Sequence, residues 1–315
     1  MPAGFTGTPQ TRLDPLQGAR TIRTNGGSSS YNSGQLSVQR RFANNLTLTG
    51  SYTYSKLMSN NDEVFAVGVA ATVTSFFAIP AVFGGDRNDR SVSLNDRTHR
   101  ASITYVYELP FMKAQRGLAG HLLGGWQLSG VTSFESGVPF TVTNGFDADG
   151  LGGSAGDRPT FNPAGRKGVR ALPVVDATGA ITGYINPDAG NAPIDPLTAE
   201  FIVNPTFSPT LANSRPRTGN LGRNTERSPG INNWDLTIQK STHLTETVRV
   251  ELRAEFFNVF NHPQFLTGSV SPFSPVGGFV PTNAATTPAG RFLNPDTVGT
   301  DGGGRVVRYQ LRLRF

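Results

Sequence analysis

Apolar and polar residues alternate at several places along the chain, most clearly in its last eleven residues. Five apolar residues of this segment share one parity, namely Val307, Tyr309, Leu311, Leu313 and Phe315. Four polar residues share the other parity, namely Arg308, Gln310, Arg312 and Arg314. Successive side chains of a strand point to opposite faces, whereas a helix would spread these arginines around its circumference. The segment is therefore predicted to be a strand with one apolar and one charged face.

The same alternation predicts seven strands in all, at about 31–43, 46–57, 97–110, 123–137, 231–241, 246–260 and 305–315. A strand that crosses a bilayer needs roughly 9 to 11 residues, and each segment is long enough. Short links occur near Asn44, over 112–121 and over 242–245, and long links run over 58–95, 138–230 and 261–304. Short turns on one side and long loops on the other are typical of outer-membrane barrels.

We therefore expect an all-β fold, an antiparallel up-and-down transmembrane β-barrel of the cell outer membrane. The chain would supply about seven C-terminal strands within 31–315, with long extracellular loops, and residues 1–30 would be the remnant of another such loop. Single-chain bacterial barrels have an even number of strands, and an open edge in lipid leaves backbone groups unpaired. Together with the absence of a visible secretory signal in the first residues, this predicts further strands upstream.

Charges of alternating sign lie on one face of the strand predicted at 246–260. They are Arg249, Glu251, Arg253 and Glu255. A dry core would not satisfy them, but a water-filled lumen does, so with Arg312 and Arg314 they are predicted to face the lumen. Two interpretations remain open: a ladder of ion pairs that neutralises itself and holds wall and plug together, which we favour, or the lining of a solute path.

Aromatic residues on the apolar parity are predicted to form girdles at the two membrane interfaces. They are Tyr52, Tyr54, Trp126, Trp234, Tyr309 and Phe315.

Composition narrows the possible functions. Charged residues make up only 16% of the chain, and the 21 phenylalanines argue against general disorder. Cysteine is absent, which excludes disulfides, thiolate metal sites and cysteine nucleophiles. The formal charge of +6 comes from scattered arginines without a basic run, so nucleic-acid binding is not expected.

Five segments resemble the C-terminal barrel of TonB-dependent outer-membrane receptors, particularly the Oar-like group with a carboxypeptidase-regulatory-like domain. They are YNSGQLSVQRRFANNLTLTGSYTYSK (31–56), LNDRTHRASITYVYELPF (94–111), GGWQLSGVTSFESGVPFTV (124–142), GNLGRNTERSPGINNWDLTIQK (219–240) and RVELRAEFFNVFNHPQF (249–265). The resemblance implies a barrel of roughly 22 strands around a plug, energised by a TonB complex, that takes up a large solute. It also implies that Phe315 is the signal for the barrel-assembly machinery. The sequence itself shows no plug or TonB-contacting segment, which we expect upstream.

Several short motifs point to other functions. Ser154 lies in a G-x-S-x-G pattern, but prolines follow where the nucleophile elbow needs a helix. Gly150 and Gly152 begin an incomplete dinucleotide fingerprint. Asp147 and Asp149 form part of a calcium-loop pattern that lacks its first ligand and its closing Glu, so no more than an adventitious cation site is expected. The four histidines have no metal-ligand spacing. We therefore expect neither an enzyme nor a cofactor.

The uncharged stretch 64–85 is long enough for a transmembrane helix, but its proline, glycines and Ser/Thr residues favour a packed external loop or a ligand-contacting surface. Two rival functions remain: an outer-membrane adhesion or structural barrel without transport, and a soluble β-sandwich hydrolase built on Ser154.

Overall fold

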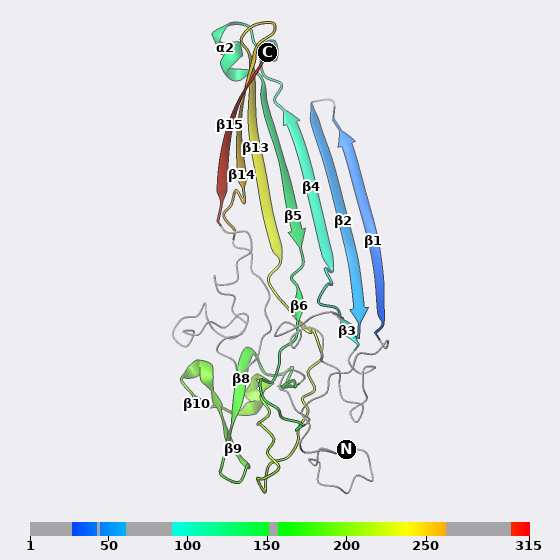
Figure 1. Cartoon of the computed structure of the whole chain (residues 1–315), viewed down its shortest axis with the longest axis vertical. Helices are drawn as coiled ribbons and strands as arrows, with labels where there is room; N and C mark the ends of the chain where they lie inside the picture. The colour runs from blue at the N-terminus through cyan, green and yellow to red at the C-terminus, as the bar shows by residue number, and fades with distance from the viewer. Residues whose placement is uncertain (1–26, 43–44, 61–89, 151–156, 263–303) are drawn as a thin grey trace.

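A computed structural model describes residues 27–42, 45–60, 90–150, 157–262 and 304–315. Seven long strands, each antiparallel to its neighbours, follow one another in a single sheet (Figure 1). They are β1 (Ser29–Arg41), β2 (Leu46–Ser59), β4 (His99–Glu108), β5 (Trp126–Glu135), β13 (Ile231–His243), β14 (Arg249–Phe257) and β15 (Val306–Arg314). The short β3 (Ser91–Val92) pairs with the end of β2. The expected antiparallel, sequentially ordered sheet is confirmed.

The ends of these strands differ from the predicted ones by up to three residues. Residues 29 and 30, at the end of the predicted loop remnant 1–30, belong to β1. The expected turn after β1 contains Asn45, which has a φ of 61°. Asparagine tolerates this left-handed conformation better than most residues, and Phe42 N–H donates to the Leu46 carbonyl across the turn.

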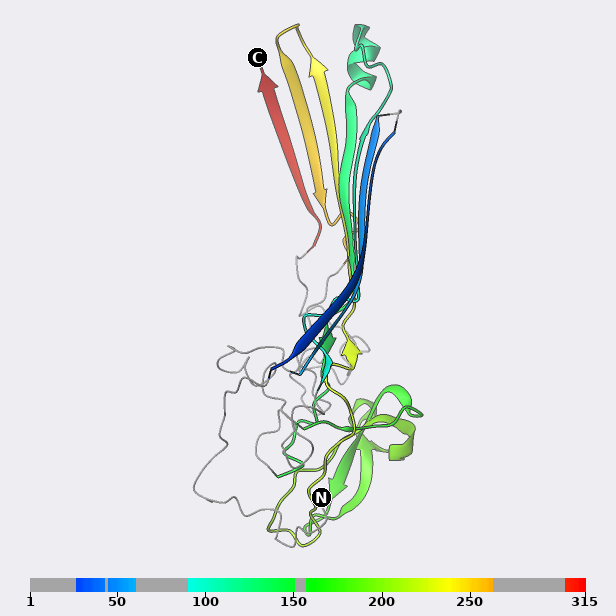
Figure 2. The ribbon, with the colours of Figure 1, turned by 90° about the vertical axis from the view of Figure 1, so that its right-hand side faces the viewer.

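The register brings the predicted apolar rows of all seven strands to one face. One row of Cα partners runs from Arg40 through Leu48, Tyr105, Gly130, Leu236 and Phe256 to Val307. Directly paired residues lie on the same face of a sheet, so the parity predicted for each strand holds across the whole sheet. The row begins near the last residue of β1, at the end of the sheet that carries the β1–β2 turn. It finishes near the first residue of β15, at the other end of the sheet. This stagger is the strand tilt that a barrel wall requires, and the sheet is curved (Figure 2).

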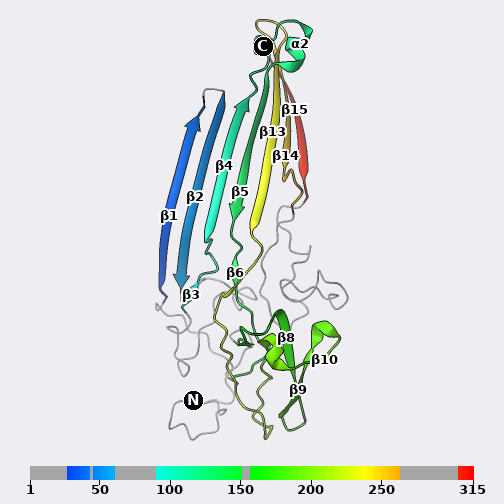
Figure 3. The same cartoon turned by 180° about the vertical axis from the view of Figure 1, so that it is seen from behind.

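The two ends of the sheet differ. At one end, here the turn end, lie the β1–β2 and β13–β14 turns, the short helix α2 (Gly117–Leu123) and the C-terminus (Figure 1). At the other, the loop end, lies β3, and the described connection between β5 and β13 extends beyond this end, as the view from behind also shows (Figure 3). The short links predicted from sequence therefore all lie at one end.

Residues 137–150 and 157–230 fold into a separate unit at the loop end, which we call the cap. Its larger sheet has the order β10-β9-β8-β11-β7, with a parallel β11–β8 pair. Its elements are β7 (Thr160–Phe161), β8 (Arg166–Val175), β9 (Ile181–Asn186), η3 (Pro187–Ala189), β10 (Ala192–Pro193), η4 (Pro196–Thr198) and β11 (Ala199–Ile202). A small second sheet pairs β6 (Pro139–Phe140) with β12 (Glu226–Arg227). The sequence had predicted only a long link here.

The cap also holds the buried hydrophobic side chains found in the described part of the chain. They are Phe140, Val142, Ala148, Ala171, Ala199, Phe201, Val203, Phe207 and Leu221. On the long sheet, by contrast, apolar residues are exposed: Leu311 by 72% and Leu36 by 62%. Water-soluble monomers rarely expose an apolar surface that spans a whole sheet, whereas a barrel wall presents such a surface to lipid.

Candidate functional site

The six charged residues predicted to face a lumen lie on β14 and β15, on the face opposite the apolar rows. Arg249 is the Cα partner of Arg314, and Glu251 is the Cα partner of Arg312. Arg253 and Glu255 follow on the same face. We call this polar surface of the long sheet the inner face. Whether it lines a closed lumen stays a prediction.

Ion pairs connect part of this set. Glu255, only 6% exposed, is bound by Arg253 at 2.7 Å and by Arg308 of β15. Arg314 lies 3.1 Å from Glu251. Arg308 also belongs to this site, although it was not among the residues predicted from the sequence. Its alternation with the apolar residues is visible in the sequence, but its position opposite Glu255 is not. These pairs form part of the predicted ladder.

Among the described residues the charges of this ladder do not balance, so the neutralisation expected from alternating sign stays a prediction. β15 places arginines, and no acidic residue, opposite the mixed charges of β14. Arg249 contacts the imidazole of His243 through its guanidinium, and no ion pair is present for Arg312 within the residues that the structure describes. The inner face of β14 and β15 therefore has a net positive charge.

The predicted girdle residues lie on the apolar face, at different heights. Trp234 is near the loop end, Trp126 and Phe315 are at the turn end, and Tyr52 and Tyr54 lie near the middle of β2. Tyr309 lies between these levels on the edge strand β15. Trp234 is packed edge-on against Phe134 and Phe260. That these residues form girdles in a bilayer stays a prediction.

A buried ion pair joins the cap to the long sheet. Arg227 of β12 donates to Asp96, which precedes β4, at 2.6 Å. The Asp96 side chain is fully buried and also accepts from the Leu57 backbone N–H of β2 and from the Thr98 hydroxyl. Burial by itself raises the pKa of Asp96, but these hydrogen bonds outweigh it, so that the pKa lies below its ordinary value.

Two further residues hold the same junction. Arg223 donates to Ser91 of β3 and to the Ser59 carbonyl of β2. Asn224 donates to the Val92 carbonyl. The segment 223–227 thus connects β2, β3 and the cap. The sequence interpretation quoted this segment only as part of a resemblance, because a link between residues more than 100 positions apart leaves no local pattern.

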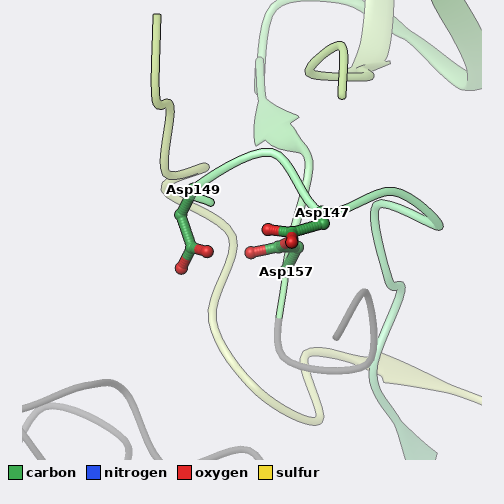
Figure 4. A group of neighbouring side chains, drawn as sticks. All are labelled: Asp147, Asp149 and Asp157. Atoms are coloured by element: carbon green, nitrogen blue, oxygen red, sulfur yellow. The ribbon is translucent and has the colours of Figure 1, made fainter. Parts of the chain in front are cut away.

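Three aspartates meet inside the cap: Asp147, Asp149 and Asp157 (Figure 4). One carboxylate oxygen from each lies within 4.8 Å of the others. Asp157 is only 7% exposed and accepts from the Ala148 backbone N–H. Burial first, and then the neighbouring Asp149 and Asp147 charges, raise the pKa of Asp157 to about 7. Either a proton or a hard divalent cation would relieve this repulsion.

The stability of the cap should fall as pH rises from about 4 to about 7. The folded-state pKa of Asp157, about 7, is above the unfolded value of 3.8, so the folded cap binds the proton more tightly within this window. The stability that this proton contributes is complete below the unfolded pKa and is lost above the folded pKa. The measurement is hydrogen exchange of cap amides at several pH values. Asp157→Asn should flatten the profile; an unchanged slope in that variant would contradict the assignment.

Several candidates from the sequence lie outside the described residues, among them Ser154 and the whole stretch 64–85. Among the residues that the structure does describe, no helix combines the length and the hydropathy needed to cross a membrane. In the same residues the three aspartates form the only metal-capable group, and no histidine joins it.

Comparison with known proteins gives one assignment. A protein family described as "Outer membrane beta barrel domain" matches residues 2–293. No curated protein matches the chain.

Proposed function

The chain belongs to the outer-membrane β-barrel family and is an outer-membrane protein, and from this premise we propose that it forms part of a TonB-dependent receptor of the Oar-like type. Such a receptor would bind a large solute outside the cell and take it up with energy supplied through a TonB complex. The five segments that resemble this group include most of the long strands, and the cap provides a folded surface at the loop end.

One observation carries the proposal: β1 and β15, the two edges of the long sheet, run in the same direction. Both strands run from the loop end to the turn end. Pairing them with each other, or with a second copy in the same orientation, would create a parallel pair. An antiparallel barrel therefore needs an odd number of further strands between them, from outside the described residues or from another polypeptide. A barrel enlarged to roughly 22 strands in this way has room for a plug, whereas one of about 8 strands does not.

The proposal assigns a side to each end. The turn end and Phe315 lie on the periplasmic side, where Phe315 serves as the assembly signal, and the cap with the long connections lies outside. Short periplasmic turns and long external loops are the usual arrangement. The role of the chain is binding and passage of a solute, and we assign no covalent chemistry to it.

The absence of cysteine gives a direct test, because an introduced thiol is the only one within these 315 residues. Thr237 lies on the inner face, opposite Glu255. In Thr237→Cys, an impermeant maleimide added outside cells should label the thiol slowly while a plug fills the lumen. A protonophore, which removes the energy for plug movement, should slow labelling further. The matched control is Leu252→Cys on the apolar face of β14, where lipid should block labelling whether or not the protonophore is present.

Labelling of Thr237→Cys that is fast and insensitive to the protonophore would instead support an adhesion or structural barrel without transport. Equal labelling of the two cysteines would contradict the assignment of the two faces and, with it, the receptor proposal.

A further inference from the structure

A polar hollow lies on the inner face towards the turn end, between β13, β14 and β15. Its volume is about 90 Å³, or about three water molecules at ~30 Å³ each. The residues that line it are Gln239, Glu251, Arg253, Gln310, Arg312 and Arg314. Three arginines face one glutamate, and two amide side chains complete the wall. The hollow is therefore small, positively charged and rich in hydrogen-bond donors.

One buried donor beside this hollow lacks a partner within the described part of the chain, and one exposed arginine is in no ion pair there. The Nε–H of Arg253 is buried and makes no hydrogen bond, although another nitrogen of the same guanidinium binds Glu255. Arg312 is in no ion pair there, since the carboxylate of its Cα partner Glu251 is bound by Arg314. A buried donor without a partner is uncommon in folded proteins, because it forfeits its hydrogen bonds to water. Within the described residues, the Nε–H of Arg253 therefore has no acceptor.

We propose that this hollow binds a single oxyanion group, a carboxylate, sulfate or phosphate carried by the solute. A planar or tetrahedral group with several acceptor oxygens matches arginine forks, and such charge-assisted hydrogen bonds are among the strongest in proteins. The hollow has room for one such group but not for a folded polypeptide segment. The solute class that follows is anionic. The inference rests on the proposed function only in naming the solute as the source of this group.

Glu251 affects how strongly the hollow would bind anions and cations. Its carboxylate is the one negative charge in the wall, and it holds the Arg314 guanidinium beside the hollow. Repulsion from Glu251 limits affinity for an anion, while a cation meets three arginines. Removing this carboxylate should therefore strengthen anion binding, and removing an arginine should weaken it.

The test measures binding of inorganic phosphate to the full chain in detergent micelles, by ³¹P NMR relaxation at constant ionic strength. The parent chain should show saturable binding. Arg312→Gln should weaken it about tenfold, the usual effect of losing one charge-assisted hydrogen bond. Glu251→Gln should strengthen it. Arg312→Lys, which keeps the charge but loses the fork, should fall between Arg312→Gln and the parent.

The matched control is Arg41→Gln, which removes the same charge from the inner face of β1, at the other edge of the sheet. Binding should stay within twofold of the parent. Equal weakening in Arg41→Gln and Arg312→Gln would mean that only general electrostatics attracts the ion, and would overturn the site. So would an absence of saturation in the parent. Carboxylate and sulfate salts used in place of phosphate identify the preferred group.

These outcomes are independent of the cysteine labelling test. Saturable binding that Arg312→Gln abolishes, together with labelling that ignores the protonophore, would retain the oxyanion site and reject transport. An absence of saturable binding, together with labelling that the protonophore slows, would retain transport and reject the oxyanion site.

Discussion

Replacing Arg227 with alanine should destabilise the junction between the cap and the long sheet by about 3 kcal/mol, the lower part of the range for removing one partner of a buried ion pair. The substitution leaves the fully buried carboxylate of Asp96 without its cation. We expect a value in the lower part of this energy range because the Arg227 side chain is 33% exposed. Native-state hydrogen exchange of the Leu57 and Ser228 amides, which lie on either side of the junction, measures the loss.

The loss should depend on pH in a defined direction. In the parent, the hydrogen bonds from Arg227 and its neighbours hold the pKa of Asp96 below its ordinary value. This stability is present above the unfolded pKa and is lost as pH falls through the folded pKa. Without Arg227 that contribution disappears, so parent and variant should differ most near neutral pH and converge in acid.

An exposed ion pair serves as the control. Lys113 lies 3.9 Å from Glu108, and both side chains are about half exposed, so Lys113→Ala should cost less than about 1 kcal/mol. Adding Asp96→Asn to Arg227→Ala should recover part of the loss, because the buried charge is removed as well. Exchange at Leu57 and Ser228 that is the same in parent and Arg227→Ala would show that the pair does not hold the cap.

Leu252→Arg should reduce the stability of the membrane-inserted chain by about 2 to 4 kcal/mol, the cost of an arginine on the lipid face near the bilayer midplane. Leu252 is on the apolar face near the middle of β14 and is 49% exposed. Its neighbours across the strands are Lys240 and Leu311. Urea-induced unfolding of the full chain from lipid vesicles measures the change.

Thr237→Arg is the matched substitution on the opposite face of the neighbouring strand β13. The Cα partner of Thr237 on β14 is Glu255, and the inner face meets water in the proposed barrel. The stability of the inserted chain should therefore change by less than about 1 kcal/mol. If both substitutions cost the same, the two faces of the sheet share one solvent and the membrane orientation of the strands is wrong.

Local alternation predicted the long strands because each residue of a strand reports its own face. The segment 305–315 shows this best: its two parities are visible without knowledge of any neighbour. Strand ends were less certain, since turn residues such as Phe42 continue the alternation beyond the last paired position. The order of the strands followed from the short links.

The cap could not be predicted in the same way. Its strands are mostly short, β7 and β6 having two residues each, and its parallel β11–β8 pair joins segments with no shared periodicity. Its core residue Phe201 is fully buried, but it comes from a strand of only four residues, too short for an alternation to stand out. Contacts between distant segments decided this unit.

The sequence by itself therefore determined which residues form the wall and which of the two faces each side chain takes. Successive side chains of a strand point to opposite faces, so a difference in solvent between the faces appears in the sequence as an alternation of apolar and polar residues. Only the tertiary structure decided which charges meet. It placed Arg308 beside Glu255, left Arg312 without a carboxylate among the described residues, and joined Asp96 to Arg227. Pairing depends on register and on long-range return of the chain, and neither is recorded in the local pattern.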